Sequence, residues 1–162
     1  MRAVIQRVAQ ASVSGGGHTV SIGRGVCVFI GIASDDTKAD ADFIIRRILD
    51  VRLFPDLEPG QTADSARQAR WAKSVGELSA EVLLVSQFTL HAVFKSNRSL
   101  SFHRSMVPNE AECLFYDLCE SMRAAHQAPH LVKNCVFGSY MNVALVNDGP
   151  VTVLLDSKHP KG

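Results

Sequence analysis

The first third of the chain carries alternating and continuous apolar stretches, which predict a series of short β-strands. The expected strands are Ala3–Val8, Ala11–Val13, Thr19–Ile22 and Val26–Ile32. Glycine clusters separate them at Gly15-Gly16-Gly17 and at Gly23-Arg24-Gly25. Because glycine tolerates the positive φ angles of tight turns, we interpret both clusters as hairpin turns.

Two later segments carry apolar residues three and four positions apart, which predicts amphipathic helices. The first is capped by Asp35-Asp36-Thr37, and the second begins at Pro108, a residue favoured in the first helical turn. The expected buried positions are Ile44, Ile45, Ile48 and Leu49 in the first helix, and Leu114, Phe115, Leu118, Cys119 and Met122 in the second.

The remaining apolar runs complete a strand-rich order with two helices. Further strands are expected at Val51–Phe54, Glu81–Val85, Met141–Val146 and Val151–Leu155. We predict an α/β fold in which mixed β-sheets form a layered sandwich or barrel-like core, with the two main helices packed on one face. No linker or repeat divides residues 1–162, so we expect one domain with a surface insertion at 57–70.

Composition narrows the class of protein. Hydrophobic residues make up 46% of the chain and charged residues 20%, which is typical of a globular protein. The net charge of +1 argues against a protein that coats long nucleic acids, but it allows one that grips only the end of an RNA. Without a signal peptide or a run of membrane-spanning length, the expected location is the cytoplasm and no membrane contact is expected.

The search for catalytic motifs first gives exclusions. His126 and His130 are separated by Pro129, which spoils a helical metal pair, so we expect no metal and no cofactor. The four cysteines have no CxxC spacing, and two of them lie in segments expected to be core strand or core helix, which is typical of small buried hydrophobic residues, with the role of Cys135 left open. No GxSxG elbow is present, so an α/β-hydrolase triad has no support.

Polar residues gather at the end of one buried strand, in Ser86-Gln87-Phe88-Thr89-Leu90. On pattern alone this is either the ordinary polar end of a strand or a hydroxyl nucleophile with His91 as its base. The segment Asn147-Asp148-Gly149-Pro150, taken locally, is typical of a hairpin turn between two strands.

Several segments in the same order along nearly the whole chain resemble D-aminoacyl-tRNA deacylases. The resemblance rests on Met1–Val8, the glycine-rich turn region, Arg52–Phe54, Trp71–Val75, Ser86–Leu90, Phe137–Met141 and Asn147–Thr152. Ser-Gln-Phe-Thr-Leu and Asn-Asp-Gly-Pro-Val-Thr are the specific motifs, and their occurrence together is what gives the resemblance its strength. The form Ser-Gln-Phe is closer to the branch specific for D-amino acids than to the branch with Pro-Gln-Ala.

The resemblance implies a hydrolase that cleaves the ester of D-aminoacyl-tRNA, and of glycyl-tRNA, as a proofreading step in translation. Its catalytic segment would comprise Ser86, Gln87, Phe88 and Thr89, with backbone N–H groups near Phe88 and Thr89 binding the oxyanion. An alternative makes Thr89 a nucleophile. The terminal adenosine of the tRNA would be held by Phe137, Gly138, Tyr140 and Met141.

The resemblance also implies a homodimer with the active site at the interface. Gly149 and Pro150, joined by a cis peptide bond, would enter the partner's pocket and exclude L-aminoacyl substrates, while Arg7 supports their loop. Two other functions stay open from the residues themselves. They are a Ser/Thr esterase that uses Thr89 or Ser86 on small esters, and a non-catalytic nucleic-acid-binding module.

One segment departs from the family pattern. Residues Lys95–Phe102 lack the Gly and Pro that the family usually carries after its Ser-Gln motif, and the segment is one residue longer. The resemblance therefore implies no backbone path for this loop.

Overall fold

The computed structural model describes residues 1–56 and 71–160. Its centre is a six-stranded sheet with the order β10–β1–β3–β6–β9, in which β2 also pairs with β1. The strands are β1 (Arg2–Gly15), β2 (His18–Ile22), β3 (Gly25–Gly31), β6 (Glu81–Ser86), β9 (Val132–Asn134) and β10 (Met141–Asp156). Strand β1 is antiparallel to its neighbours, whereas β3, β6 and β9 run parallel. The sheet is therefore mixed, as predicted.

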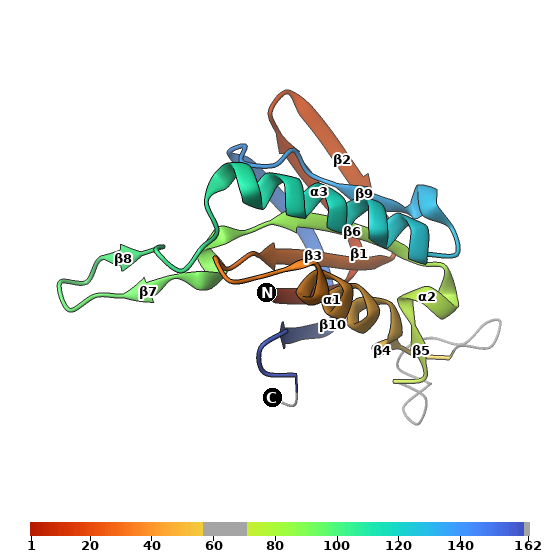
Figure 1. Cartoon of the computed structure of the whole chain (residues 1–162). Helices are drawn as coiled ribbons and strands as arrows, with labels where there is room; N and C mark the ends of the chain where they lie inside the picture. Colours follow the sequence, from red (N-terminus) through yellow and green to blue (C-terminus); the bar gives the residue numbers. More distant parts are fainter. Residues whose placement is uncertain (57–70, 161–162) are drawn as a thin grey trace.

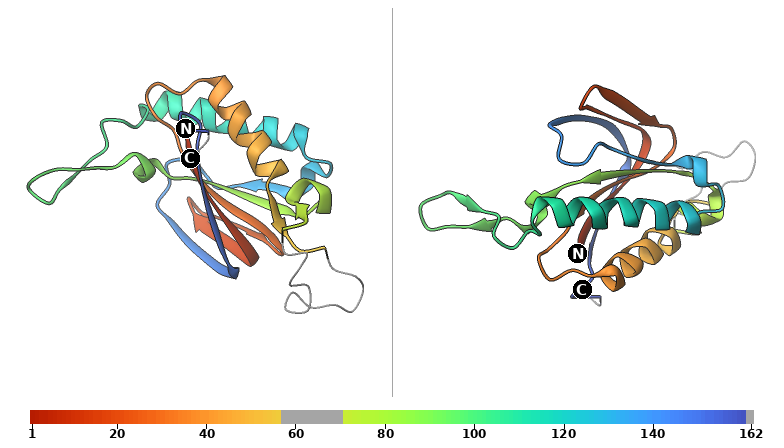
Figure 2. Two further views of the ribbon diagram at one scale, coloured as in Figure 1. Left: turned by 90° about the horizontal axis from the view of Figure 1, so that it is seen from below. Right: turned by 45° about the horizontal axis from the view of Figure 1, so that its top comes forward.

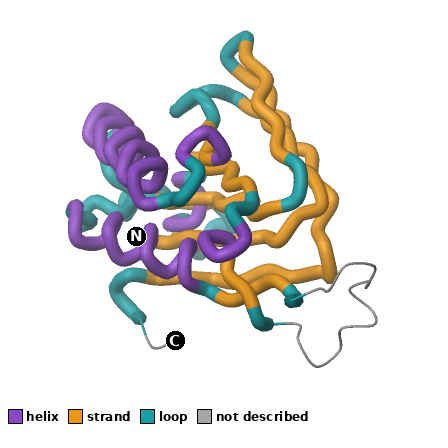
Figure 3. Tube along the Cα trace, turned by 90° about the vertical axis from the view of Figure 1, so that its right-hand side faces the viewer, coloured by secondary structure: helices purple, strands orange, loops and turns teal. Residues whose placement is uncertain are grey.

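The two long helices, α1 (Lys38–Asp50) and α3 (Pro108–Ala125), lie side by side over one face of the curved sheet (Figures 1 and 3). The short elements are α2 (Val75–Leu78), η2 (Phe88–His91), η3 (Pro129–Leu131), the pair β4 (Arg52–Phe54) and β5 (Lys73–Ser74), and the pair β7 (Val93–Phe94) and β8 (Leu100–Ser101). The predicted fold class, with two main helices on one face, is confirmed. The predicted insertion at residues 57–70 lies outside the described residues.

The helix boundaries follow from local chemistry. Thr37 and Asp40 form a capping box at the start of α1, which satisfies backbone N–H groups that the first turn leaves without partners. Pro108 occupies the start of α3, where a missing N–H costs nothing. The predicted buried stripes are confirmed except that Leu49 and Leu114 are half-buried, and Ala41 and Ala111 join the buried set.

The amino-terminal strands differ from the prediction. The two strands expected at Ala3–Val8 and Ala11–Val13 are one strand, β1. Gly16 and Gly17 have φ angles of +59° and +77° and form the predicted hairpin turn into β2. The second glycine cluster is not a hairpin turn, because β2 and β3 pair with successive parts of β1 and not with each other. The chain bends near Gly23 and continues along β1.

The carboxy-terminal strands also differ from the prediction. The structure has one strand, β10, where two strands around a hairpin turn were expected. Its register against β1 shifts between the pairs Gln6–Thr152 and Val8–Asn147, so residues 148–151 form an excursion opposite Arg7. A local sequence pattern cannot separate such a bulge from a hairpin, because only the long-range pairing with β1 distinguishes them. The interpretation of residues 147–150 as a hairpin turn is therefore wrong.

Burial explains why the layers stay together. Strand β6 is covered on both faces, and its residues Val82–Val85 are almost fully buried. A continuous apolar run is what a parallel strand in this position requires. Among the described residues, no helix has the length and the apolar character needed to cross a membrane.

We expect Phe115→Ala to be strongly destabilising. The side chain is fully buried in α3, and its ring centroid lies 5.6 Å from that of Phe137, which leads into β10. Removing a buried phenylalanine ring costs about 3–5 kcal/mol. Chemical denaturation should show this loss in the free energy of unfolding, and a much smaller loss for Leu114→Ala at the half-buried neighbouring position. Equal losses in the two variants would contradict the assigned core.

Candidate active site

Strand β6 and its exit carry the predicted catalytic segment. Ser86 ends β6, where it pairs with Ile30 of β3, and the backbone N–H of Gln87 donates to the carbonyl of Ile30 at 2.7 Å. The chain then turns directly into the single 3₁₀ turn η2, which begins at Phe88. Two parallel strands therefore fix the point from which the turn starts.

The turn η2 is seated on Gly31. A Cβ atom at Gly31 would lie 2.8 Å from Cβ of Leu90 and 3.0 Å from the carbonyl oxygen of Gln87. The imidazole Nε2 of His91 lies 3.1 Å from the carbonyl oxygen of Gly31, and Nη1 of Arg2 donates to the carbonyl of Leu90 at 3.0 Å. Glycine is required here for close approach, and the turn is held at both ends.

The first two amides of η2 are available to a ligand. A 3₁₀ helix cannot satisfy its own initial N–H groups. Within the described part of the chain, the N–H groups of Phe88 and Thr89 have no hydrogen-bond acceptor. The N–H groups of Leu90 and Ala92 donate to the carbonyls of Gln87 and Thr89. Two adjacent donors at the end of a strand match what a developing oxyanion needs.

A cavity of about 440 Å³ lies beside this turn. Its wall brings together the two sets of residues that the sequence predicted for catalysis and for the terminal adenosine. The lining includes Ser86, Gln87, Phe88, Phe137, Gly138, Tyr140 and Met141, together with apolar residues of β3, β6 and α3. The side chain of Thr89 is exposed and does not line the cavity. The Thr89 hydroxyl accepts a hydrogen bond from the side-chain amide Nε2 of Gln87.

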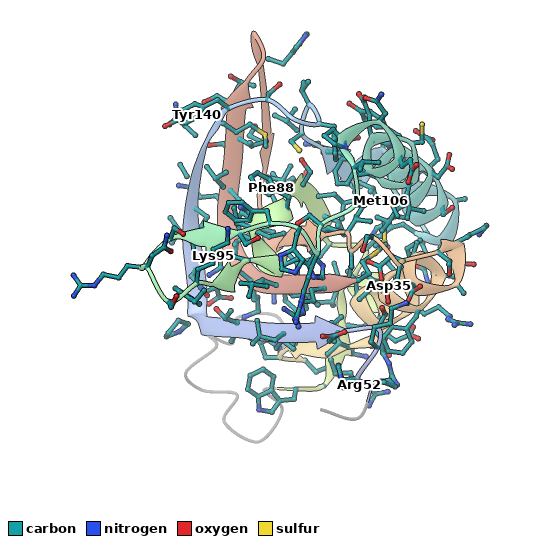
Figure 4. All side chains as sticks on the ribbon, turned by 60° about the vertical axis from the view of Figure 1, so that its left-hand side comes forward. Asp35, Arg52, Phe88, Lys95, Met106 and Tyr140 are labelled. Atoms are coloured by element: carbon teal, nitrogen blue, oxygen red, sulfur yellow. The ribbon has the colours of Figure 1, made fainter. Side chains whose placement is uncertain are left out.

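The aromatic residues that line the cavity differ in how tightly the rest of the protein packs against them. The Phe88 ring packs edge-on against Phe102 with the centroids 4.9 Å apart. Phe137 packs on buried Phe115, and its N–H donates to the Tyr116 hydroxyl at 3.3 Å. Tyr140 is 92% exposed (Figure 4). Its ring is therefore free to meet a ligand.

His91 is a poor base in this arrangement. Burial lowers the pKa of its imidazole, which favours the neutral form, and the carbonyl of Gly31 occupies Nε2. Among the described residues, no hydrogen bond joins His91 to Ser86 or Thr89. The geometry therefore gives no support to a hydroxyl–histidine nucleophile.

Cys135, whose role the sequence left open, has a structural contact here. Its sulfur is buried and accepts from the N–H of Ser86 at 3.4 Å, which links β9 to the start of the catalytic segment. Cys27 and Cys119 lie nearby, and burial raises the pKa of each thiol to about 12. Within residues 1–56 and 71–160, no three His, Cys, Asp or Glu side chains gather as a metal site would require.

The second predicted motif lies on the β10 excursion. The Gly149–Pro150 peptide bond is cis, as the resemblance implied, and both residues are exposed. Asn147 closes the base of the excursion, since its side chain accepts from the Val151 N–H at 2.9 Å and donates to the Thr152 hydroxyl at 3.2 Å. Neither Gly149 nor Pro150 lines the cavity of its own chain.

Arg7 supports this excursion from below. Its side chain is buried, and Nε lies 3.2 Å from the carbonyl oxygen and 3.1 Å from the carboxylate of Asp148. Nη1 donates to the carbonyl of Leu53, and the guanidinium lies over the Phe54 ring at 6.0 Å from its centroid. A buried charge with these partners is fully satisfied and fixes the backbone of the loop.

The sequence prediction missed Gly31 and Arg2 as supports of the catalytic turn. For Gly31 a signal was present, because an isolated glycine inside a strand pattern indicates a close approach of another backbone. Arg2 carried no such signal, since its contact with Leu90 spans 88 positions along the chain.

Comparison with known proteins identifies the family of this chain. Residues 4–156 match the family described as D-Tyr-tRNA(Tyr) deacylase. The chain is 45% identical over 161 residues to D-aminoacyl-tRNA deacylase 1 of Bos taurus. This alignment covers 99% of this chain and 72% of that protein. The chain is 44% identical to the Leishmania major protein of the same name, over 98% of each. A solved structure titled c-Myc DNA Unwinding Element Binding Protein superposes with a TM-score of 0.84 at 41% identity, covering 96% of this chain and 98% of that one.

The fold and these relatives define the class of protein as a hydrolase. The chain belongs to the D-aminoacyl-tRNA deacylase family.

We expect Gly31→Ala to lower turnover in a deacylation assay by about 100-fold, the effect of displacing reactive groups by roughly 1 Å. The new methyl group would push on Leu90 and on the Gln87 carbonyl, and so on the amides of η2. The matched control is Gly23→Ala, where the nearest atom to a new Cβ is 3.9 Å away. Wild-type turnover in a folded Gly31→Ala variant would refute the assigned role of the turn.

Proposed function

We propose that this protein hydrolyses the ester between a D-amino acid and the 3′-terminal ribose of tRNA, a chiral proofreading step of cytoplasmic translation. The observation that carries the proposal is the cavity that joins Ser86–Phe88, at the start of the turn with the free amides, to the Phe137–Met141 segment. The relatives named D-aminoacyl-tRNA deacylase support the same reaction.

Hydrolysis proceeds by addition of water to the ester carbonyl carbon, followed by cleavage of the bond to the ribose oxygen. The N–H groups of Phe88 and Thr89 stabilise the oxyanion, and one such donor contributes about 100- to 1000-fold in rate. The terminal 2′-hydroxyl of the RNA assists the attacking water, and the ribose oxygen leaves with a proton. No protein side chain is required as a base, which fits a His91 imidazole whose pKa is lowered by burial, so that it is a weaker base, and whose Nε2 contacts the Gly31 carbonyl.

The terminal adenosine occupies the part of the cavity formed by Phe137, Gly138, Tyr140 and Met141. The exposed Tyr140 ring supplies a flat surface on which a base can stack, worth about 1–3 kcal/mol. The Met141 side chain adapts to the edge of the base. The ester then points toward Gln87 and the amides of η2.

The working unit is a homodimer in which Gly149 and Pro150 of one subunit close the cavity of the other. Two observations support this assembly. The motif is exposed yet absent from the cavity of its own chain. Strand β10 is an edge strand with exposed Val143, Val146 and Leu154, the last of them 75% exposed, an apolar surface that a second copy would cover.

L-Aminoacyl substrates are rejected sterically by the rigid backbone of Gly149 and Pro150. The Gly149 and Pro150 backbone accepts from the α-amino group of the substrate and occupies the volume that an L side chain would need. Arg7 and Asn147 hold this backbone in place, and a wall that cannot yield is what steric discrimination requires.

The proposal is tested with matched D- and L-tyrosyl-tRNA. We expect rapid release of D-tyrosine and little release of L-tyrosine, and we expect glycyl-tRNA to be cleaved because glycine has no side chain to exclude. The measurement is the rate of loss of labelled amino acid from each tRNA. Equal rates for the D and L substrates, or cleavage of neither, would overturn the proposed function.

Replacing Arg7 should damage selectivity more than hydrolysis. Arg7→Met keeps the apolar stem but removes the contacts with Asp148 and Leu53, so the loop loses its support. We expect the ratio of D to L cleavage to fall about tenfold or more, by roughly 1.4 kcal/mol of discrimination. The control is Arg46→Ala on the exposed face of α1. An unchanged D/L ratio in a folded Arg7→Met variant would sink the assigned role of Arg7.

A further inference from the structure

A basic hairpin extends from η2, and only its base contacts the site described above. It consists of residues 92–105 and contains β7 and β8, paired at Val93–Ser101 and Phe94–Leu100. The hairpin projects beyond the helices and the main sheet in every ribbon view (Figures 1 and 2). Such a projection buries little apolar area, since Phe94 is 85% exposed. Core packing therefore does not account for it.

The hairpin tip is an ordered turn. The Lys95 N–H donates to the Ser99 carbonyl at 2.9 Å, and the Arg98 N–H donates to the Lys95 carbonyl at 3.2 Å. Asn97 accepts from both the N–H and the hydroxyl of Ser99. The cationic side chains at the tip thus project from a defined backbone.

Charge is distributed unevenly around this hairpin. Residues 82–109 contain no Asp or Glu, but they include Lys95, Arg98 and Arg104. All three are exposed, and within the described part of the chain none forms an ion pair. The rest of the chain is net negative, because the whole has 17 basic and 16 acidic residues. An unpaired cationic projection on such a protein favours a polyanionic partner.

The base of the hairpin contacts the catalytic turn directly. Phe102 packs edge-on against Phe88, and the Ser105 hydroxyl donates to the Phe88 carbonyl at 3.1 Å. Figure 4 shows Lys95, Phe88 and Tyr140 on the same side of the molecule. The segment from Phe102 back to Arg98 can span at most about 13 Å, the length of about four stacked nucleotides. A ligand that occupies the cavity and continues as a polynucleotide would pass within reach of the tip.

We propose that this hairpin is a second RNA-binding element, in which Lys95 and Arg98 bind tRNA phosphates upstream of the terminal adenosine. The inference rests on the proposed function, because the tRNA 3′ end in the cavity sets the direction of the chain. The contacts are to phosphate and carry no base specificity, so the hairpin serves tRNAs of different sequence.

The test uses Lys95→Gln/Arg98→Asn. Asparagine suits position 98 because φ there is +64° and asparagine tolerates this left-handed conformation. We expect KM for D-tyrosyl-tRNA to rise about tenfold, and the salt dependence of log kcat/KM to weaken by roughly 0.7–0.9 for each lost phosphate contact. Activity on the D-tyrosyl ester of adenosine, which has no upstream phosphates, should fall far less. Arg46→Gln on the exposed face of α1 removes a cation from another part of the surface and is the control.

Three results would overturn the inference. The first is an unchanged KM and salt slope on tRNA, and the second is an equal loss of activity on the adenosine ester. The third is dissociation of the variant into monomers, observed by analytical ultracentrifugation, which would make the hairpin a contact between protein subunits. Binding of uncharged tRNA, measured directly by fluorescence titration, separates this inference from the proposed function. If the wild type cleaves no D-aminoacyl ester but the variant still binds tRNA more weakly, the hairpin assignment stands and the proposed function fails.

Discussion

Both functional segments depend on the pairing of β1 with a neighbour on each side. On one side, buried Arg7 of β1 carries the β10 excursion through its contacts with Asp148. On the other side, β1 pairs with β3, whose Ile30 and Gly31 seat the catalytic turn. A guanidinium is costly to bury unless its donors are satisfied, so the loop and Arg7 stabilise each other. A shift in the β1 register would displace both segments together.

The proposed mechanism relies on backbone donors, and the structure holds these donors in place. The amides of Phe88 and Thr89 are presented by a turn that is held between Gly31 and Arg2, so their positions are set before a substrate arrives. Preorganised donors lower the barrier without reorganisation during the reaction. Two reactive side chains near the turn are held by other contacts. Cys135 is buried against Ser86, and His91 is bonded to Gly31.

Local chemistry made much of the fold predictable, whereas long-range pairing did not. The cap at Thr37, the start at Pro108 and the stripes of α1 and α3 depend on residues a few positions apart, and all were predicted. Other features depend on partners far along the chain, and the local patterns misassigned them. They are the continuity of β1 and of β10 as single strands, the bend near Gly23 and the bulge at residues 148–151. The candidate site was reached through two specific motifs. The supporting contacts of Arg2 and Cys135 became visible only in three dimensions, whereas Gly31 carried a signal in the strand pattern that the prediction did not use.

In the proposed dimer, the turn η2 and the Gly149–Pro150 loop of one site lie on different subunits. Mixed dimers of an Arg7→Met chain and a Gly31→Ala chain, co-expressed with different tags and purified, test this arrangement by their D/L cleavage ratio. The active turn of the Arg7→Met chain would then face the intact loop of its partner. We expect wild-type selectivity at about half the wild-type rate, since one of the two sites is intact. A mixed dimer as unselective as the Arg7→Met homodimer would show that the loop acts within its own chain and would contradict the proposed dimer.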